Sequence, residues 1–283
     1  MIKNEDKGIL YICGTPIGNL EDVTLRLLDI LKKADLIAAE DTRHTKKLLN
    51  YYNINTSLTS YHKYNKYKKA PSLIEKIKSG LKIALVSDAG MPGISDPGDI
   101  LINLAIENNI EIVPIPGASA LITALVVSGL STYHFVFDGF LPRKSLERKK
   151  YFKKLENEER TIIFYEAPHR LKKTLKDMLN VWGDRKIAIA RELTKNYEEI
   201  IRGKLSQVLN KIELRDIKGE ITLVVQGEIK QKKENIADHF NEEYLKQLKN
   251  QGYSNKDIIK ITQERLNISK NIIYKKLLEM KNK

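Results

Sequence analysis

KIALVSDAGMPGISDPG, residues 82–98, is the most informative segment of the sequence. Residues 82–86 form an apolar run of strand length, and the twelve residues that follow include three glycines and two prolines. Glycine lets a backbone approach a ligand closely, and proline fixes the shape of a loop beforehand. A long loop of this kind directly after a buried strand predicts a ligand site at the carboxyl end of a sheet.

Two carboxylates stand in this loop, at Asp88 and Asp96. A carboxylate is suited to bind ribose hydroxyls, an ammonium group or a sulfonium. Asp96 is equally suited to cap the helix that begins near residue 97, so its role stays open between capping and ligand contact.

Strand and helix patterns alternate on both sides of this loop, and we therefore expect an α/β fold with a largely parallel sheet. Strands are expected at 8–13, 36–39, 82–86, 111–114, 135–139, 161–165, 186–191, 198–204 and 220–226. Helices are expected at 22–34, 42–51, 99–108, 119–129, 145–157, 171–181 and 206–212. The late strands could pair antiparallel. We expect an N-terminal α/β domain over 1–130, a second α/β domain over 131–229 and a basic helical module over 230–283.

The composition shifts after residue 227, where EIKQKKEN at 228–235 is typical of a linker. Helices are expected beyond it at 236–250, 255–266 and 269–280, with Ser254 and Ser269 as N-caps. The last two helices and their short connection resemble a helix-turn-helix. Basic residues crowd this module and indicate contact with nucleic acid, with Lys256 and Lys270 as candidates. The alternative is a helical tail that packs on the body or on a partner subunit.

The 283 residues carry a formal net charge of +13, which favours a polyanionic partner such as nucleic acid, with a membrane surface as second choice. Alternatively, the lysines could reflect the codon usage of an AT-rich genome, without any such partner. A single cysteine, Cys13, excludes an internal disulfide and a cysteine cluster, and the five histidines lack paired spacing, so we expect no metal site. The sequence shows neither a signal-peptide core nor an apolar run of ~18 residues, which favours the cytoplasm and no membrane.

Two further loops follow expected strands. GTPIGN at 14–19 matches neither GxGxxG nor the triphosphate-binding loop. PIPGASA at 114–120 leads into an apolar helix, where Ser119 could cap the helix while nearby N–H groups receive a polar ligand group.

With these loops, the chain resembles the tetrapyrrole methylase superfamily, and within it the rRNA small subunit methyltransferase I family. The motifs that carry the resemblance are TPIGNLEDVTLR (15–26), AAEDTRHTKKLL (38–49), VSDAGMPGISDPG (86–98), PIPGASALITAL (114–125), GFLPRK (139–144), FYEAPHRL (164–171), ARELTK (190–195) and KGEITLVVQG (218–227). The sequence departs from the family pattern at Met91 and Gly93, where a threonine and a larger apolar residue are expected, and this could alter how the cofactor packs.

The resemblance implies a two-domain tetrapyrrole-methylase-like fold and a homodimer. It also implies S-adenosylmethionine-dependent 2′-O-methylation of a cytidine ribose in the decoding region of 16S rRNA, within the small ribosomal subunit. The cofactor would lie between the two domains. The residues implied to bind it are Pro16, Asp88, Ala89, Gly90, Met91, Ser119, Ala120, Tyr165, Glu166, Ala167, Leu193 and Gly219.

A ribose hydroxyl needs a nearby base, or a cation that stabilises the developing alkoxide. The catalytic candidates are Glu40, Asp41, Arg43 and Glu166. Asp88 is a further possible base, Lys144, Arg170 and Lys195 are further cations, and His44 or His169 could shuttle a proton. The sequence does not single out the base, and Asp41 could simply cap the next helix.

The candidates for RNA contact are Arg43, His62, Arg143, Lys144, Arg170, Lys256 and Lys270. His62 lies in SYHKYN, where Tyr61 and Tyr64 stand in an expected loop rich in Lys63, Lys66, Lys68 and Lys69. Aromatic rings interleaved with lysine can stack on bases while pairing with phosphates. A flexible surface loop, and a solvated charge pair at Arg143 and Lys144, are the plain alternatives.

Two other functions stay open. One is a methyltransferase of the same superfamily that acts on a tetrapyrrole or on diphthine. The other is a non-catalytic rRNA-binding assembly protein that kept the fold but does not bind the cofactor.

Overall fold

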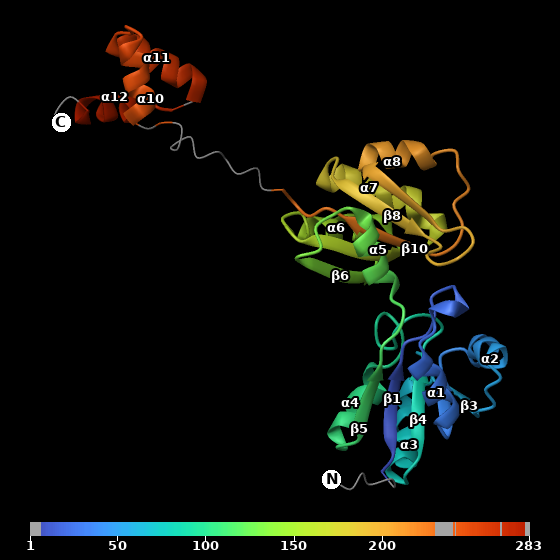
Figure 1. Ribbon diagram of the computed structural model, residues 1–283. Coiled ribbons are helices and arrows are strands. Elements are labelled where there is room, and N and C mark those ends of the chain that lie inside the picture. The colour runs from blue at the N-terminus through green and yellow to red at the C-terminus, as the bar shows by residue number, and fades with distance from the viewer. Residues whose placement is uncertain (1–6, 230–239, 241, 267, 281–283) are drawn as a thin grey trace. The chain divides into compact units, whose positions relative to one another are not determined.

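The computed structural model describes residues 7–229, 240, 242–266 and 268–280. The chain forms two compact units, residues 1–228 and 229–283, and the described part of the first contains two five-stranded sheets (Figure 1). None of the described helices is long and apolar enough to cross a membrane.

The first sheet has the strand order β3-β2-β4-β1-β5 and is parallel throughout. Its strands are β1 (Ile9–Cys13), β2 (Leu36–Ala39), β3 (Leu58–Ser60), β4 (Lys82–Val86) and β5 (Glu111–Ile115). Cys13 pairs with Val86 on one side and with Ile115 on the other, so the loops that follow these strands begin side by side. The expected parallel sheet is confirmed, and its register gathers the loops at one edge.

Helices cover both faces of this sheet: α1 (Leu25–Lys33), α2 (Thr42–Tyr51), α3 (Lys66–Lys78) and α4 (Asp99–Glu107), with a short 3-10 turn, η1 (Leu20–Asp22). Helices α3 and α4 contribute Ile77 and Leu101 to one core, and α1 and α2 contribute Leu31 and Leu49 to the other. Cys13 is a buried member of the second core. Burying each such side chain stabilises the fold by about 1.5–3 kcal/mol.

The prediction of a lysine-rich loop around His62 was wrong in part, because Lys66, Lys68 and Lys69 lie in a helix. Residues 66–78 form α3, whose buried positions Ala70, Leu73, Ile74 and Ile77 follow helical spacing. Tyr61 is also buried, and its hydroxyl accepts a hydrogen bond from the Leu101 amide at 3.2 Å, so its ring cannot stack on a base. The apolar period over 70–77 was the signal in the sequence that indicated a helix.

The second sheet has the order β6-β7-β10-β8-β9. Its strands are β6 (Phe135–Phe140), β7 (Thr161–Glu166), β8 (Lys186–Arg191), β9 (Glu199–Lys204) and β10 (Ile221–Val225). β6 and β7 are parallel, whereas β10 pairs antiparallel with β7 and β8, and β8 pairs antiparallel with β9. The antiparallel pairing of the late strands is as expected. The register of β6 shifts between Phe137 and Phe140, next to the region where the site lies.

The helices of this half are α5 (Ala120–Ser128), α6 (Ser145–Lys154), α7 (Leu171–Trp182), α8 (Leu205–Ile212) and the 3-10 turn η2 (Pro168–Arg170). Helix α5 packs on the second sheet, with Ala124 and Leu125 against Ile163 and Val224 (Figure 1). The expected domain boundary at residue 130 therefore follows α5, although α5 packs against the second sheet. The other face packs on α6, α7 and α8.

The second unit contains α10 (Glu242–Asn250), α11 (Asn255–Leu266) and α12 (Lys270–Glu279), and its core includes Leu245, Ile258 and Ile273. Ser254 caps α11, because its hydroxyl accepts a hydrogen bond from the Asp257 amide at 3.3 Å. Ser269 occupies the N-cap position of α12. The start of the helix expected at 236–250 and most of the expected linker at 228–235 lie outside the described residues.

Candidate functional site

Three loops meet at the carboxyl edge of the first sheet. A side-chain Cβ at Gly14 would lie 2.8 Å from the backbone nitrogen of Gly117, so both positions require glycine. The Thr15 amide donates to the Gly90 carbonyl at 2.9 Å, and the Gly90 amide donates back to Thr15 at 3.1 Å. These contacts bring together the loops that the sequence analysis singled out.

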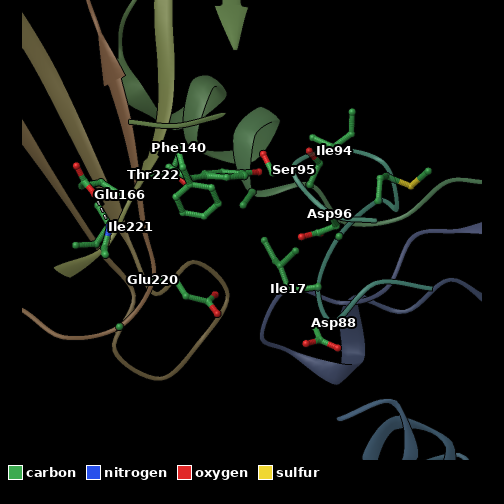
Figure 2. Close-up of a pocket in the computed structure, with 18 of the residues that line it drawn as sticks. Ile17, Asp88, Ile94, Ser95, Asp96, Phe140, Glu166, Glu220, Ile221 and Thr222 are labelled. Carbon is green, nitrogen blue, oxygen red and sulfur yellow. Dashed lines mark hydrogen bonds between the residues drawn. The ribbon is translucent and has the colours of Figure 1, made fainter. Parts of the chain in front are cut away.

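A cavity of about 410 Å³ lies against these loops and also against the second sheet (Figure 2). Its volume falls in the range of ~300–1,000 Å³ that is typical of small-molecule sites. Ten of the twelve residues expected to bind the cofactor line it: Asp88, Ala89, Gly90, Met91, Ser119, Ala120, Tyr165, Glu166, Ala167 and Gly219. Pro16 and Leu193 instead line two smaller cavities, which share Asp88 and Ala120 respectively with the large one.

The lining of the large cavity is acidic although the chain as a whole is basic. Of the described residues that line it, five carry a carboxylate and none is a lysine, arginine or histidine. The five are Glu40, Asp88, Asp96, Glu166 and Glu220. A half-enclosed site lined by one sign of charge attracts ligands of the opposite sign, so this cavity favours a cation.

Three of these carboxylates come from the first sheet. Asp88 accepts a hydrogen bond from the Asp41 amide at 3.0 Å. Burial, followed by the nearby charge of Asp88, raises the pKa of Glu40. Burial, followed by the charges of Glu40 and Asp88, raises the pKa of Asp96 to about 7. A helix-capping role does not explain Asp96, because the N-cap of α4 is Gly98.

The Ser95–Asp96 turn reaches toward the second sheet. Ser95 has a left-handed backbone, with φ of 64°, and a Cβ built on Gly139 would lie 3.4 Å from its hydroxyl. Such a backbone conformation is costly for a residue other than glycine and is often found at functional sites. Figure 2 shows Ser95 and Asp96 across the cavity from Phe140 and Thr222.

Several lining residues were not anticipated. They are Ile17, Ile94, Ser95, Phe140, Pro168, Glu220, Ile221 and Thr222. Phe140 and Thr222 belong to strands of the second sheet, and the sequence does not reveal which face of a strand meets a loop from another sheet. Glu220 could have been found, since it opens the strand expected at 220–226, next to the expected Gly219.

The charged residues of the AEDTRHT block have different positions and contacts. Glu40 lines the cavity, whereas Asp41 caps α2 by accepting a hydrogen bond from the Arg43 amide at 2.8 Å. The Arg43 guanidinium also bonds Asp41 at 2.7 Å, and this pairing holds the pKa of Asp41 well below its usual range. The Arg43 side chain is 89% exposed and points to solvent. Catalytic roles for Asp41 and Arg43 stay predictions.

Glu166 lines the cavity but both of its carboxylate oxygens have protein partners. One accepts from the Thr174 hydroxyl at 2.6 Å, and the other accepts from the Ala167 amide at 2.8 Å and lies 3.2 Å from Arg170. Arg170 in turn donates to the carbonyls of Leu141 and Pro142, both at 2.8 Å. These contacts favour a positioning role for Glu166 and Arg170, and their expected catalytic and RNA-contact roles stay predictions.

Arg148 also holds this segment, residues 141–144. This buried guanidinium donates to the carbonyls of Pro142 and Arg143 at 3.2 Å and to the carboxylate of Asp177 at 2.9 Å. The side chains of Arg143 and Lys144 are exposed at the surface. Two cations, the buried Arg148 and the half-buried Arg170, thus anchor the main chain from which the side chains of Arg143 and Lys144 project.

The expected RNA contacts from the SYHKYN segment lie near Glu40, since the charges of Lys63 and His62 offset part of the rise in the pKa of Glu40. Tyr64 is 84% exposed, and the Lys63 ammonium lies 4.7 Å from its ring centre. In the C-terminal unit, the other two candidates are exposed, Lys256 on α11 and Lys270 at the start of α12.

Residues 9–209 match the family model of the Tetrapyrrole (Corrin/Porphyrin) Methylases. The fold agrees with this class: a crystal structure of diphthine synthase superposes with a TM-score of 0.59 at 15% identity, over 77% of this chain and 90% of that one. At that identity the likeness concerns the fold alone, and it confirms the two-domain tetrapyrrole-methylase-like architecture expected from the sequence.

Two relatives are much more similar. The chain is 53% identical to the ribosomal RNA small subunit methyltransferase I of Halalkalibacterium halodurans, over 80% of this chain and 78% of the relative. It is 47% identical to the protein of the same name from Bacillus subtilis, over 95% of this chain and 94% of the relative. The chain therefore belongs to the ribosomal RNA small subunit methyltransferase I family of the tetrapyrrole methylases.

S-adenosylmethionine is the methyl donor of this family, and the cavity fits it. Its sulfonium and ammonium groups are cations that suit the carboxylates of the lining. Ser119 and Ala120 place the N-terminus of α5 at the cavity, where backbone N–H groups suit the donor's own carboxylate. Apolar side chains such as Ile17, Ile94 and Phe140 supply surface for an adenine ring.

Proposed function

We propose that this protein methylates the ribose 2′-oxygen of a cytidine in the decoding region of 16S rRNA, with S-adenosylmethionine as methyl donor. The observation that carries the proposal is an acidic cavity within a strongly basic chain of this family. The acidic cavity suits a cationic donor, and the basic exterior suits a polyanionic acceptor. The relatives named above are ribosomal RNA methyltransferases, which supports ribosomal RNA as the acceptor.

Different residues of the chain are proposed to bind the methyl donor and to position the acceptor. When bound, S-adenosylmethionine supplies a methyl carbon that its positively charged sulfur makes electrophilic. Asp88 and Glu40, which line the cavity at the edge of the first sheet, would hold the cationic part of the donor. The segment 139–144 would position the acceptor, since Phe140 lines the cavity and the exposed Arg143 and Lys144 that follow it would contact phosphates. Alignment of the acceptor oxygen with the methyl carbon then supplies much of the rate.

We expect exposed groups around the cavity to contact the RNA on either side of the acceptor nucleotide. Arg43 is exposed next to Glu40, and Tyr64 with Lys63 offers a ring and a cation on the neighbouring segment. Stacking on an aromatic ring and pairing with phosphates suit a single-stranded RNA segment whose base is turned outward. The basic surface of α11 and α12, with Lys256 and Lys270, would add affinity through phosphate contacts.

We further propose a homodimer that acts in the cytoplasm on the small ribosomal subunit. Exposed apolar side chains of α5 and the segment after it support an interface, since monomers rarely leave large contiguous apolar patches in water. Val126 is 69% exposed there, and the neighbouring exposed residues are Ile122, Tyr133 and Phe135. Light scattering coupled to size-exclusion chromatography measures the mass directly, and a monomer at working concentration would contradict the dimer.

The full chain should be incubated with methyl-labelled S-adenosylmethionine and small subunits from a strain that lacks the gene. The label is then mapped by nuclease digestion and mass spectrometry. We expect one labelled ribose in 16S rRNA, with transfer abolished in Asp88→Asn and retained in Asp99→Asn. Asp99 is the matched control because its carboxylate is exposed and paired with Lys66 at 3.0 Å, away from the cavity lining.

The alternatives predict different results. Label on a base, or none on rRNA while a porphyrinoid or a diphthine-containing protein is methylated, would refute the proposed acceptor. Calorimetric titration that shows RNA binding without S-adenosylmethionine binding would favour a non-catalytic assembly protein.

A further inference from the structure

The loop that follows β1 contacts the β8–β9 loop (residues 192–198), which connects two strands of the second sheet. Ile17 of the first loop packs in one core with Leu193 of the second. The Thr194 hydroxyl accepts a hydrogen bond from the Asn19 amide at 3.1 Å. The loop after β1 is therefore joined to the second sheet by an apolar contact and by a hydrogen bond.

Lys195 extends this contact to the lining of the large cavity. Its stem passes Gly18 so closely that a Cβ added to Gly18 would lie 2.4 Å from the Lys195 Cγ. Its ammonium donates to the carboxylates of Glu192 and Glu220, at 3.0 Å each. Glu220 and Ile17 both line the large cavity (Figure 2). Lys195 thus connects the loop that carries Ile17 with Glu220, which directly precedes β10 of the second sheet.

The backbone of the β8–β9 loop is strained. Glu192 and Thr194 have left-handed conformations, with φ of 50° and 66°, which are unfavourable for such side chains and most of all for a β-branched one. The other described residues with positive φ, apart from glycines, are Asn53 and Asn109 after helices α2 and α4, and Ser95 in the cavity lining. Asparagine adopts this conformation more readily than most residues. The remaining strained positions all lie in the cavity lining or in the loop bonded to it, a distribution typical of functional strain.

Hydrogen bonds hold the β8–β9 loop in this conformation. The Glu198 carboxylate accepts from the Thr194 amide at 2.6 Å, and the Lys195 amide donates to the Glu192 carbonyl at 3.0 Å. The Glu192 amide donates to the Glu220 carbonyl at 2.9 Å, and the Glu220 amide donates to the Glu192 carboxylate at 2.8 Å. These contacts fix Thr194 and Lys195 in place before any ligand binds, so the connection is preorganised.

We propose that Lys195 is a positioning residue that braces the methyl-donor cavity and slows the departure of the donor and of its product. Lys195 is absent from the described lining of the cavity, but it holds Glu220 and the loop after β1, which do line it. A ligand between two such elements leaves more slowly when they are tied together than when each can open alone. The brace acts on the donor, so it does not depend on which acceptor is methylated.

The first test is the dissociation rate of S-adenosylhomocysteine from the full chain, measured by surface plasmon resonance. Lys195→Met keeps an apolar stem beside Gly18 but removes both bonds to carboxylates, and we expect dissociation to become about tenfold faster. Thr194→Val removes the acceptor of the Asn19 amide without changing any charge, and we expect dissociation to become about threefold faster. S-adenosylmethionine should respond in the same direction as the product.

Two further variants control this measurement. Lys195→Arg should restore most of the wild-type rate, because a guanidinium can donate to both carboxylates. Lys176→Met is the matched control, since it removes a lysine that pairs with Glu213 at 3.3 Å on α7, away from the cavity lining, and it should leave the rate unchanged. Wild-type dissociation in both Lys195→Met and Thr194→Val overturns the proposal. Tighter binding of S-adenosylmethionine with unchanged binding of the product would show that Lys195 only neutralises Glu220, and it overturns the brace as well.

Amide hydrogen exchange in the ligand-free protein tests the brace without a ligand. In Lys195→Met we expect the amides of Asn19 and Glu220 to exchange faster, because both donate to side chains of the loop that Lys195 holds. The stability against urea should change no more than in Lys176→Met. A large loss of stability with unchanged exchange at these two amides would make Lys195 a general structural residue and contradict the proposal.

Steady-state and single-turnover kinetics with small subunits separate positioning from chemistry. In Lys195→Met the KM for S-adenosylmethionine should rise, while the single-turnover rate at saturating donor should stay at the wild-type value. A lower single-turnover rate with an unchanged KM would place Lys195 in the chemical step and refute the brace. If the wild type labels no rRNA, the proposed function fails, and the dissociation and exchange measurements still decide the role of Lys195.

Discussion

Replacing Asp96 by asparagine should stabilise the ligand-free protein at alkaline pH, because the wild-type carboxylate is ionised among other negative charges. Its pKa rises from 3.8 to about 7 on folding. At 1.36 kcal/mol per pKa unit, a rise of about 3 units sets a ceiling of about 4 kcal/mol. Asp96 is partly exposed, so solvent screening reduces the expected gain to about 1–2 kcal/mol.

The sign of the pH dependence follows from proton binding. Between about pH 4 and pH 7 the folded protein holds a proton on Asp96 that the unfolded chain has lost. The free energy of unfolding contributed by this group is therefore complete below pH 4, falls as pH rises, and is lost above about pH 7. The asparagine side chain of the variant would not titrate, so the difference between variant and wild type grows across this window.

Urea unfolding of the wild type and of Asp96→Asn at pH 4.5 and pH 8 measures this difference. We expect nearly equal stabilities at the lower pH and a more stable variant at the higher pH. Asp99→Asn is a control in which the free energy of unfolding should change in the opposite direction. The pairing with Lys66 lowers the pKa of Asp99, and loss of this pair should destabilise the protein by a few tenths of a kcal/mol at pH 8. A variant at Asp96 that is less stable at pH 8, or equally stabilised at both pH values, would show that the wild-type carboxylate is not destabilised by its neighbours.

Three further changes test other parts of the structure. Gly117→Ala would place a Cβ 2.5 Å from the Gly14 carbonyl, so we expect a loss of about 1–3 kcal/mol in urea unfolding and at least a tenfold weaker affinity for S-adenosylmethionine by calorimetry; wild-type affinity would contradict the close contact. Asp177→Ala would leave the buried Arg148 unpaired and should cost about 3–5 kcal/mol, and a loss below about 1 kcal/mol would show that the pair is solvated. Arg143→Ala should weaken binding to rRNA and reduce the slope of log affinity against log salt by about one, whereas an unchanged slope would mean that this side chain contacts no phosphate.

The parts of the fold that could be predicted are those that local pattern determines. The strand at 82–86 is followed by a loop of glycine and proline, and the parallel register then forces this loop to lie beside the loops after β1 and β5. Helix α3 could have been predicted from its apolar period, but the lysine-rich start of the segment concealed it.

The chemistry of individual carboxylates could not be read from the sequence, because it depends on partners far along the chain. Glu40 and Asp41 are adjacent, yet one lines the cavity and the other caps α2. Glu166 is bonded by Thr174, and Asp96 is influenced by Glu40, which follows a different strand. Spacing in a motif does not indicate which of these side chains keeps a free oxygen.

The loop at 141–144 is anchored through main-chain carbonyls, to which Arg148 and Arg170 donate. Carbonyls are present whatever side chain a residue carries, so the anchoring does not depend on the identity of residues 143 and 144. Evolution or an engineer can therefore exchange these two surface side chains and keep the same loop conformation. Acceptor preference becomes a trait that can be varied separately from methyl-donor binding.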